Sequence, residues 1–459
     1  MDKMPPVYSP EEIDRLKKSD RTLIWHPFTQ MKEYAGEDAP IIAAGEGCYL
    51  TDISGRRYLD GISSLWVTVH GHRVPALDRA IQEQLRKIAH STLLGLGNVP
   101  SILLAERLVE IAPSGLERVF YSDNGSTGVE IALKIAFQYW HNTGVPEKKR
   151  FLSFYNAYHG DTLGAVGVGG SELFHSIYGP LVVSSLKVPS AYCYRCPYGG
   201  PGPQECGREC FDAVTRMIDR HAGELAAVII EPVIQGAAGM LTWPQGYLSH
   251  LRKLCDTYGI LLIADEVATG FGRTGRLFAC EHEGVSPDLM VVAKGITGGY
   301  LPLAATLTSK RIFDAFYAEY EELKTFFHGH TYTGNPLACA AALANLSLFE
   351  EEAVLERLPP KIKRLEELLH DFMELPHVGD IRQAGFMVGI ELVKDKKTKA
   401  PFPLARRTGR RVILKAREKG VIIRPLGDVL VLMPPLVIPE EDLRRLCAVV
   451  AESIREAAG

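Results

Sequence analysis

Lys294 is the residue whose surroundings first indicate chemistry. It follows the apolar run at 290–293 and precedes Gly295. An apolar run bounded by glycines predicts a buried strand, so this lysine is expected at a strand end beside a flexible turn. A lysine amine that is partly removed from water loses proton affinity and becomes a nucleophile near neutral pH, as a Schiff-base lysine requires. A surface lysine after a strand is the commoner alternative.

Asp265 ends a second apolar run, at 260–264, and is followed by Glu266. A carboxylate at the end of a buried strand is costly unless it has a partner. A protonated ring nitrogen would be a suitable partner, and the ion pair would keep that ring an electron sink. The alternative is an exposed aspartate in a turn, which the apolar strand before it disfavours.

The run DNGSTG at 123–128 joins a predicted strand to a predicted helix. Gly125 permits a tight turn, and Ser126 can present its backbone N–H and hydroxyl groups at the helix N-terminus. This arrangement is typical of a phosphate cradle. An ordinary helix N-cap explains the same residues equally well. The glycine spacing matches neither the dinucleotide fingerprint nor a Walker motif.

Three other residues have weaker individual signals. The ring of Tyr158 could stack on a planar cofactor, although buried tyrosines are common. Thr331 could supply a hydroxyl group to a phosphate. Arg424, beside Pro425, could bind a substrate carboxylate through its planar fork. From spacing alone, a surface ion pair is the favoured alternative for Arg424.

These residues need a scaffold, and the pattern between them predicts an α/β fold. Helices are predicted at 101–111, 129–140 and 247–258, and strands at 119–122, 151–154, 227–231, 260–264 and 290–293. Such alternation predicts crossover connections and a mostly parallel sheet flanked by helices. Ligands of these sheets bind beyond the carboxyl ends of the strands.

The pattern changes at both ends of the chain. A hairpin is predicted around Ser54-Gly55 and another around Gly427-Asp428, and helices at 361–373 and 406–419. We therefore expect residues 76–344 to form the large domain. The segments 1–75 and 345–459 are expected to form a smaller α+β domain from both termini.

Composition excludes several classes of protein. The 459 residues are 46% hydrophobic and 23% charged, with a net charge of −4. There is no basic excess for nucleic acid or an anionic membrane, and no apolar run is long enough to span a bilayer. No secretory signal is recognisable, so a cytosolic location is expected.

Four of the nine cysteines cluster at 193, 196, 206 and 210. Their spacing could hold zinc, but reduced thiols in a Pro/Gly-rich loop are the favoured interpretation, because the second pair is widely spaced. The His-Gly-His pairs at 70–72 and 328–330 lack the helical spacing of zinc hydrolases. No metal is assigned.

Taken together, the chain resembles the class III, fold-type-I, pyridoxal-phosphate-dependent aminotransferases. The resemblance spans roughly Trp25 to Pro435 and rests on NGS at 124–126, YHG at 158–160, DEVATGFGRTG at 265–275, AKG at 293–295 and TYTGNP at 331–336. WHPFTQM at 25–31, SSLW at 63–66, HG at 70–71, AH at 89–90 and Ala268 resemble the branch that aminates 8-amino-7-oxononanoate in biotin synthesis. Glutamine is common at the position of Ala268 in relatives that act on ornithine or 4-aminobutyrate.

The resemblance implies a role for each matching residue. Lys294 would carry pyridoxal 5′-phosphate and move the proton as acid and base, and Asp265 would pair with the pyridinium. The other residues implied to bind the cofactor are Gly125, Ser126 and Tyr158, with His330 and Thr331 from the neighbouring subunit of a homodimer. The residues implied to contact substrate are Leu65, Trp66, Tyr158, Lys294, Gly329 and Arg424, with Arg424 as the carboxylate anchor.

Two departures from the family concern the amino donor. The family often has tryptophan at the position of Leu65 and tyrosine at that of Phe28. Their loss removes a stacking surface and a hydrogen bond. S-adenosylmethionine is the leading donor, and lysine is the alternative. Two further alternatives are an ω-aminotransferase of the same class acting on a diamine or ω-amino acid, and a pyridoxal-phosphate-binding regulator. The regulator is disfavoured because no basic DNA-recognition segment remains.

Overall fold

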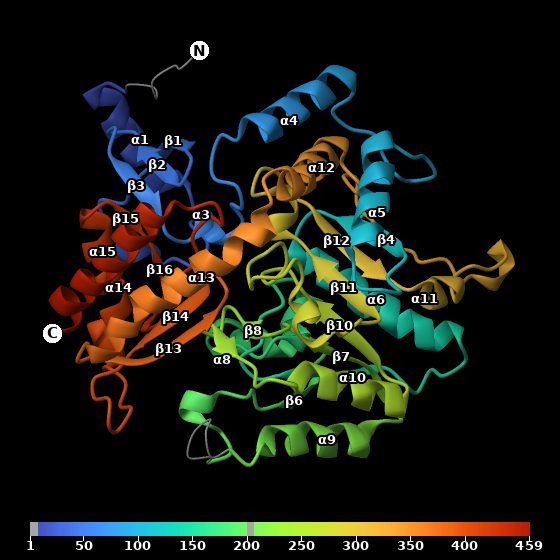
Figure 1. Ribbon diagram of the computed structural model, residues 1–459. Coiled ribbons are helices and arrows are strands. Elements are labelled where there is room, and N and C mark those ends of the chain that lie inside the picture. The colour runs from blue at the N-terminus through green and yellow to red at the C-terminus, as the bar shows by residue number, and fades with distance from the viewer. Residues whose placement is uncertain (1–7, 200–205) are drawn as a thin grey trace.

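A seven-stranded sheet forms the centre of the protein, in the order β4-β12-β11-β10-β7-β5-β6 (Figure 1). The computed structural model describes residues 8–199 and 206–459. The strands are β4 (Arg118–Ser122), β5 (Arg150–Phe154), β6 (Leu186–Val188), β7 (Leu225–Ile230), β10 (Leu261–Asp265), β11 (Leu289–Val292) and β12 (Ala304–Thr308). Neighbours pair in parallel except β12, which is antiparallel to both β11 and β4. The predicted mostly parallel sheet is confirmed, whereas β12 was not predicted.

Helices cover both faces of this sheet, which explains why its strands are apolar throughout. Along β7, Ala227 and Ile229 belong to one core cluster, while Val228 and Ile230 belong to the other. The first face packs against α6 (Gly125–Asn142) and α7 (Leu163–Val168). The second face packs against α5 (Val99–Ile111), α9 (Glu209–His221), α10 (Tyr247–Tyr258) and α12 (Pro336–Glu351).

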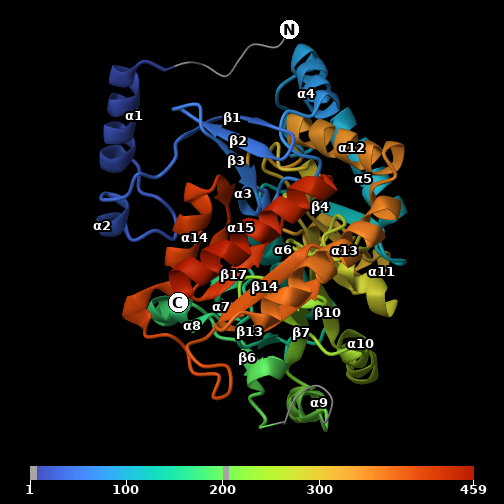
Figure 2. The ribbon, with the colours of Figure 1, turned by 60° about the vertical axis from the view of Figure 1, so that its left-hand side comes forward.

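Two four-stranded sheets are built from the ends of the chain. The first contains β1 (Ile42–Glu46), β2 (Tyr49–Asp52), β3 (Arg57–Asp60) and β15 (Val421–Ile422); the second contains β13 (Val378–Ala384), β14 (Met387–Leu392), β17 (Val429–Leu432) and β16 (Arg424–Leu426). In the first sheet β15 runs parallel to β3, so N- and C-terminal segments lie side by side (Figure 2). The hairpins predicted at Ser54-Gly55 and Gly427-Asp428 are both confirmed. The domain boundaries at 75 and 344 stay predictions.

Helices near the C-terminus pack on these smaller sheets: α13 (Val354–His370), α14 (Thr408–Glu418) and α15 (Glu440–Ala458). The remaining elements are α1 (Pro10–Leu23), α2 (Met31–Tyr34), α3 (Ser63–Trp66), α4 (Pro75–Lys87), α8 (Glu172–His175), α11 (Lys310–Asp314), the two-stranded pair β8 (Ile234–Gln235) and β9 (Leu241–Thr242), and the 3-10 turns η1 (Ser176–Leu181), η2 (Cys193–Arg195), η4 (Ala279–Glu283), η5 (Lys294–Thr297), η6 (Tyr320–Glu322), η7 (Asp371–Glu374) and η8 (Leu404–Arg406). Within residues 8–199 and 206–459, every helix is too short or too polar to cross a membrane.

Helix α12 holds the turn η5 that begins at Lys294. Asn335 caps α12 and Pro336 occupies its first turn. Further along the helix, the fully buried Asn345 donates hydrogen bonds from Nδ2 to the carbonyl oxygens of Gly295 and Ile296, each 3.0 Å long. One buried amide therefore anchors the backbone that follows Lys294.

Replacing Asn345 should loosen this turn. We expect Asn345→Ala to destabilise the cofactor-free protein by about 2 kcal/mol, because two buried carbonyl groups lose their donors. Asn345→Asp, which keeps the shape but offers no N–H group, should be at least as damaging. Urea denaturation measures both variants. Unchanged stability in both would show that the two hydrogen bonds do not hold η5.

Candidate active site

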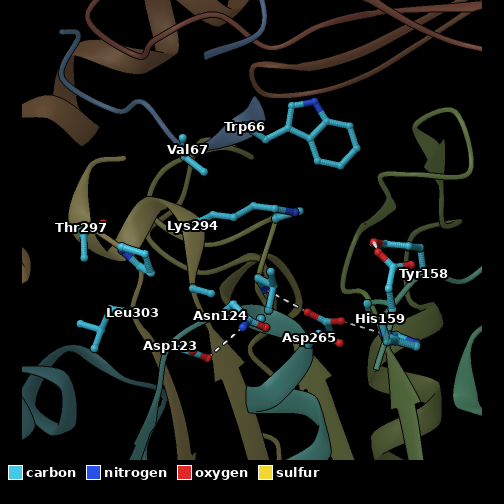
Figure 3. A pocket seen from close by; sticks show the side chains of 18 of the residues that line it. Trp66, Val67, Asp123, Asn124, Tyr158, His159, Asp265, Lys294, Thr297 and Leu303 are labelled. Atoms are coloured by element: carbon cyan, nitrogen blue, oxygen red, sulfur yellow. Dashed lines mark hydrogen bonds and ion pairs between the residues drawn. The ribbon is translucent and has the colours of Figure 1, made fainter. Parts of the chain in front are cut away.

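A cavity of about 710 Å³ lies beyond the carboxyl ends of β10 and β11 (Figure 3). This is where the parallel-sheet rule places ligand sites. Six residues singled out from the sequence line it: Trp66, Gly125, Ser126, Tyr158, Asp265 and Lys294. They come from segments more than 200 residues apart, so the fold brings the predicted chemistry together.

Lys294 opens η5 with an unusual backbone. Its φ of 45° lies in the left-handed region, which is sterically costly for a residue with a side chain and is typical of functional sites. The ammonium nitrogen lies 4.8 Å from the centre of the Trp66 ring. Burial lowers the pKa of Lys294, against the opposing effect of the carboxylates of Asp265 and Glu231. The site therefore favours the neutral amine more than water does.

Asp265 is held in one orientation. Its side chain is buried, with Oδ2 2.6 Å from His159 Nδ1, and Oδ1 accepts a hydrogen bond of 3.0 Å from the Val267 N–H group. The sequence motif contained His159, but only its neighbour Tyr158 was assigned a role. Its position immediately after a predicted strand and turn was the available signal. His159 fixes the carboxylate that would face a cofactor ring.

Helix α6 begins at Gly125 beside the cavity, and the N-cap interpretation of this motif is confirmed, whereas the phosphate cradle stays a prediction. Asn124 is the N-cap, with its side-chain oxygen accepting a 3.0 Å hydrogen bond from the Thr127 N–H group. The first N–H groups of a helix have no intrahelical partner, so those at 125 and 126 stay suitable for an anion. The cap orders the turn, and the helix N-terminus supplies the positive end of the helix dipole.

Two glycines let neighbouring segments pack closely against this helix end. A Cβ atom at Gly125 would lie 2.5 Å from a methyl group of Val267, and one at Gly160 would lie 2.2 Å from Ser126 Oγ. The Ser126 hydroxyl accepts a 3.0 Å hydrogen bond from the Thr162 N–H group. Only glycine fits at either position, so the cradle depends on the close approach of three backbone segments.

Glu231 is a site residue that the sequence analysis missed. It follows β7 and is fully enclosed, with its carboxylate accepting hydrogen bonds from the N–H groups of Tyr158, at 3.1 Å, and Gly236, at 2.9 Å. Burial raises its pKa to about 7; His159 opposes the shift and Asp265 adds to it. The signal that identified Asp265, a carboxylate ending an apolar strand, was equally present here.

The segment that carries Trp66 is strained. Ser63, Ser64 and Trp66 have φ values of 51°, 59° and 66°. The buried carboxylate of Asp60 accepts hydrogen bonds of 2.9 and 2.8 Å from the Ser64 N–H group. Trp66 is thereby held over Lys294, whereas the adjacent Leu65 is 48% exposed and does not line the cavity.

Arg424 lies in a neighbouring cavity of about 590 Å³, which Phe28 also lines. Phe174 connects the two regions, since its ring packs edge-on against both Phe28 and Tyr158. Burial lowers the pKa of Arg424, and Tyr158 opposes that shift. The structure therefore places Arg424 near Tyr158 but outside the lining of the first cavity.

The motif at 329–331 also lies outside the lining of the first cavity. Gly329 and Thr331 are exposed. His330 accepts a 3.2 Å hydrogen bond at Nδ1 from the Tyr332 N–H group, while its buried Nε2 has no partner within the described part of the chain. A single copy of the chain does not bring these residues to Lys294.

Cysteine and histidine clusters were also compared with metal geometry. Within the ranges 8–199 and 206–459, no group of three or more Cys, His, Asp or Glu side chains is placed to hold a metal ion. Burial, with Cys206 adding to it, raises the pKa of Cys193 and brings that of Cys210 to about 11, which favours the protonated thiols.

Comparison with known proteins places this geometry in one class. The model of the aminotransferase class-III family matches residues 34–454, and the chain belongs to that family. A relative in Geobacter sulfurreducens, 53% identical over 98% of this chain and 99% of its own length, is an adenosylmethionine-8-amino-7-oxononanoate aminotransferase. A relative of the same name in Aquifex aeolicus is 56% identical over 96% of this chain and 97% of its own length.

Solved structures agree. The adenosylmethionine-8-amino-7-oxononanoate aminotransferase of Methanocaldococcus jannaschii superposes with a TM-score of 0.93 at 48% identity, covering 97% of this chain and 99% of its own. The ω-transaminase of Pseudomonas jessenii, solved in complex with PMP, has a TM-score of 0.92 at 31% identity, covering 96% and 98%. The predicted fold-type-I architecture is confirmed.

Pyridoxal 5′-phosphate is the cofactor of this class, and the cavity fits it. The free N–H groups of a helix N-terminus suit the phosphate, Asp265 suits a protonated ring nitrogen, and Lys294 presents a buried amine. When bound, the cofactor withdraws electrons from the substrate carbon that loses its proton. The protein is a transaminase.

Glu231 should make stability depend on pH in the cofactor-free protein. Its pKa is about 7 when folded and near 4.5 when unfolded, so unfolding releases its proton between these values. Stability should fall as pH rises through this window, by on the order of 3 kcal/mol. Glu231→Gln removes the titration, so its stability should exceed that of the wild type increasingly from pH 4.5 to 7. Parallel urea-denaturation profiles for the two proteins would contradict the assignment.

Proposed function

We propose that this chain transfers the amino group of S-adenosylmethionine to 8-amino-7-oxononanoate, giving 7,8-diaminononanoate for biotin synthesis. The observation that carries the proposal is the near-full-length identity of 53% and 56% with relatives that bear this activity in their names. Ala268 in the cavity is consistent with it, because relatives that act on ornithine or 4-aminobutyrate commonly have glutamine there.

In this proposal Lys294 binds the cofactor and then carries the proton to and from the reacting carbon. Its lowered pKa supports both roles, because a neutral amine is at once a nucleophile and a base. Asp265, oriented by His159, pairs with the ring nitrogen. Gly125 and Ser126 bind the phosphate, and Tyr158 covers the ring.

Substrate binding is assigned to the two cavities on either side of Phe174. Trp66 forms the wall over Lys294. Leu65 and Gly329 are assigned to the substrate from the family resemblance alone, since neither lines this cavity. Arg424 anchors the carboxylate of 8-amino-7-oxononanoate beyond Tyr158. The geometry supports this assignment, because a long keto acid needs its carboxylate held well away from the reacting carbon, and Arg424 lies in the second cavity.

The proposal includes a cytoplasmic homodimer with shared sites. His330 and Thr331 would reach the phosphate of the partner subunit. Two features support this: the motif lies outside the cavity of its own chain, and it is surrounded by exposed apolar side chains, including Phe327 and Tyr332, exposed by 70% and 61%.

Lysine is the alternative donor, and two observations favour considering it. Leu65 offers no indole, and Phe28 has no hydroxyl group to donate a hydrogen bond. Phe28 instead packs on Phe174 near Arg424. A wall with fewer stacking and polar contacts suits an adenosyl group less well than it suits an alkyl chain.

Loss of Lys294 should abolish the reaction. Lys294→Ala is expected to lower the rate of diaminononanoate formation by roughly a thousandfold or more, because nucleophile and proton carrier are removed together. Lys310→Ala is a suitable control, since this lysine is exposed and pairs with Asp314 on α11. Retained amino transfer in Lys294→Ala would show that Lys294 is not catalytic.

The amino donor is identified by a direct comparison. Purified protein with pyridoxal phosphate and 8-amino-7-oxononanoate is supplied in turn with S-adenosylmethionine, lysine and 4-aminobutyrate, and 7,8-diaminononanoate is quantified by mass spectrometry. S-adenosylmethionine is expected to support the fastest formation. Faster formation with lysine would show that lysine is the amino donor, and the assignment to biotin synthesis would stand. If no donor gave 7,8-diaminononanoate while 4-aminobutyrate alone bleached the absorbance of the bound pyridoxal phosphate, the protein would be an ω-aminotransferase and the biotin assignment would be overturned.

A further inference from the structure

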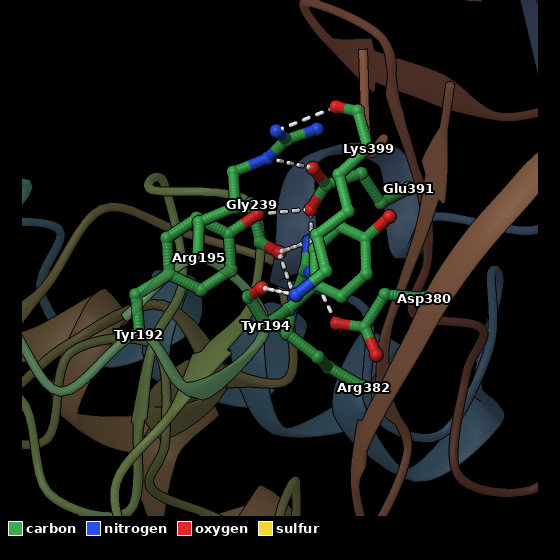
Figure 4. Close-up of polar contacts among 8 residues, drawn as sticks. All are labelled: Tyr192, Tyr194, Arg195, Gly239, Asp380, Arg382, Glu391 and Lys399. Atoms are coloured by element: carbon green, nitrogen blue, oxygen red, sulfur yellow. Dashed lines mark hydrogen bonds and ion pairs between the residues drawn. The ribbon is translucent and has the colours of Figure 1, made fainter. Parts of the chain in front are cut away.

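A buried charged cluster lies between the C-terminal sheet and the large sheet's loops (Figure 4). At its centre is Arg382 of β13, whose side chain is 6% exposed. Its Nη1 lies 2.7 Å from Glu391 Oε2 on β14 and 2.6 Å from Asp380 Oδ2. An enclosed guanidinium is costly unless each of its N–H groups has an acceptor, so the N–H groups on Nε and Nη2 need acceptors as well.

Those donors cross to the other part of the chain. Arg382 Nε and Nη2 both donate to the carbonyl oxygen of Gly239, at 3.1 and 2.9 Å. Gly239 lies in the turn at 236–240, which joins β8 to β9. Within the turn, the N–H groups of Gly239 and Met240 donate to the Gly236 carbonyl oxygen at 3.1 and 3.0 Å. Arg382 therefore holds a tight turn by its outer carbonyl group.

The same turn is a wall of the active-site cavity. Ala237 lines the cavity, and the Gly236 N–H group donates to Glu231. A Cβ atom at Gly236 would lie 3.2 Å from the Trp66 ring. Met240 and Trp66 belong to one small core cluster. The turn is thus held by Glu231 on the cavity side and by Arg382 on the opposite side, with Trp66 resting against it.

Close backbone packing fixes the turn further. A Cβ atom at Gly389 of β14 would lie 2.6 Å from the Gly239 carbonyl oxygen and 2.9 Å from Met240 Cβ. The turn therefore sits directly on the C-terminal sheet, and any side chain at 389 would push it away. Hydrogen bonding by Arg382 and steric fit at Gly389 are independent observations of the same docking.

The segment at 192–195, which begins the loop with the clustered cysteines, covers the outer face of the cluster. Tyr192 donates its hydroxyl group to Glu391, and Arg195 Nε lies 2.8 Å from Glu391 Oε1. Burial opposes the charge on Arg382, but Tyr192, Glu391 and Asp380 together raise its pKa. Arg382 thus stays charged throughout the working pH range.

We propose that Arg382 is a positioning residue for amino transfer: by binding the Gly239 carbonyl oxygen it fixes the turn at 236–240, and through that turn the Trp66 wall over Lys294. Glu391 orients Arg382. The shape of the substrate cavity then depends on the docking of the C-terminal sheet. The inference rests on the proposed function only in taking this cavity as the place where the amine reacts.

The first test is structural and needs neither cofactor nor substrate. Hydrogen exchange is measured by mass spectrometry on the cofactor-free protein, in peptides covering 236–241. Arg382→Met should speed exchange of the Gly239 and Met240 amides by roughly tenfold or more, because the turn opens locally. Arg252→Met is the matched control: Arg252 of α10 pairs at 2.8 Å with Asp288, just before β11 begins and at the other end of that strand from the cavity. Unchanged exchange in Arg382→Met would overturn the proposal.

The second test separates positioning from stability. Arg382→Met removes the most buried of the cations that pair with Glu391, leaving only Arg195 and Tyr192, and should lower the unfolding midpoint. The double variant R382M/E391L removes that carboxylate too, so the midpoint should recover, since buried ion pairs are often replaceable by apolar residues. Its exchange at 236–241 should stay fast, and its kcat/KM for the amino acceptor should stay roughly ten- to a hundredfold low, mainly through KM. If the exchange at 236–241 and kcat/KM both returned to wild-type values together with the unfolding midpoint, the role of Arg382 would be only structural.

Gly389→Ala gives an independent variant in which Arg382 and Glu391 remain paired. Its methyl group should displace the Gly239 carbonyl and reproduce the fast exchange and raised KM. Wild-type exchange and KM in Gly389→Ala would contradict the coupling. If exchange responds as expected but no donor supports amino transfer, the positioning role stands and the proposed reaction fails.

Discussion

Two carboxylates, Asp265 and Glu231, end neighbouring strands of a sheet that is apolar on both faces. Burying a negative charge at such a place costs free energy, and the two carboxylates are stabilised in different ways. Asp265 is oriented by His159 and lines the cavity. Glu231 accepts two backbone N–H groups and has its pKa raised by burial. Both carboxylates line the cavity, where burial lowers the pKa of Lys294 against their opposing effect.

The loops around that edge are held by single buried polar groups. Asn345 anchors the turn after Lys294, Asp60 anchors the strained segment before Trp66, and Arg382 anchors the turn at 236–240. None of these three needs to touch a reacting atom. Each binds a loop to a rigid helix or sheet and so fixes the position of that loop. Strained backbone persists at a site only where the surrounding structure holds it in this way.

Much of this could be predicted from sequence, for a local reason. Lys294, Asp265 and the turn at 123–128 each adjoin a strand end, so the parallel-sheet rule placed them together. Glu231 met the same criterion and was overlooked. Arg382 could not be predicted, because its partner Gly239 is 143 residues away and the pairing depends on how two sheets dock. Strand β12 was missed because its antiparallel direction breaks the alternation that identified its neighbours.

The pairing of β3 with β15 has a consequence for the order of folding. Ser63, beside the strained segment, donates its hydroxyl to the Met433 carbonyl oxygen, 370 residues further along the chain. Contacts of such long sequence separation form late, because the closure of a large loop must come first. A chain emerging from the ribosome can therefore assemble the central sheet and its cofactor cradle early. The aromatic wall that shapes the substrate cavity forms only once residue 433 has been made.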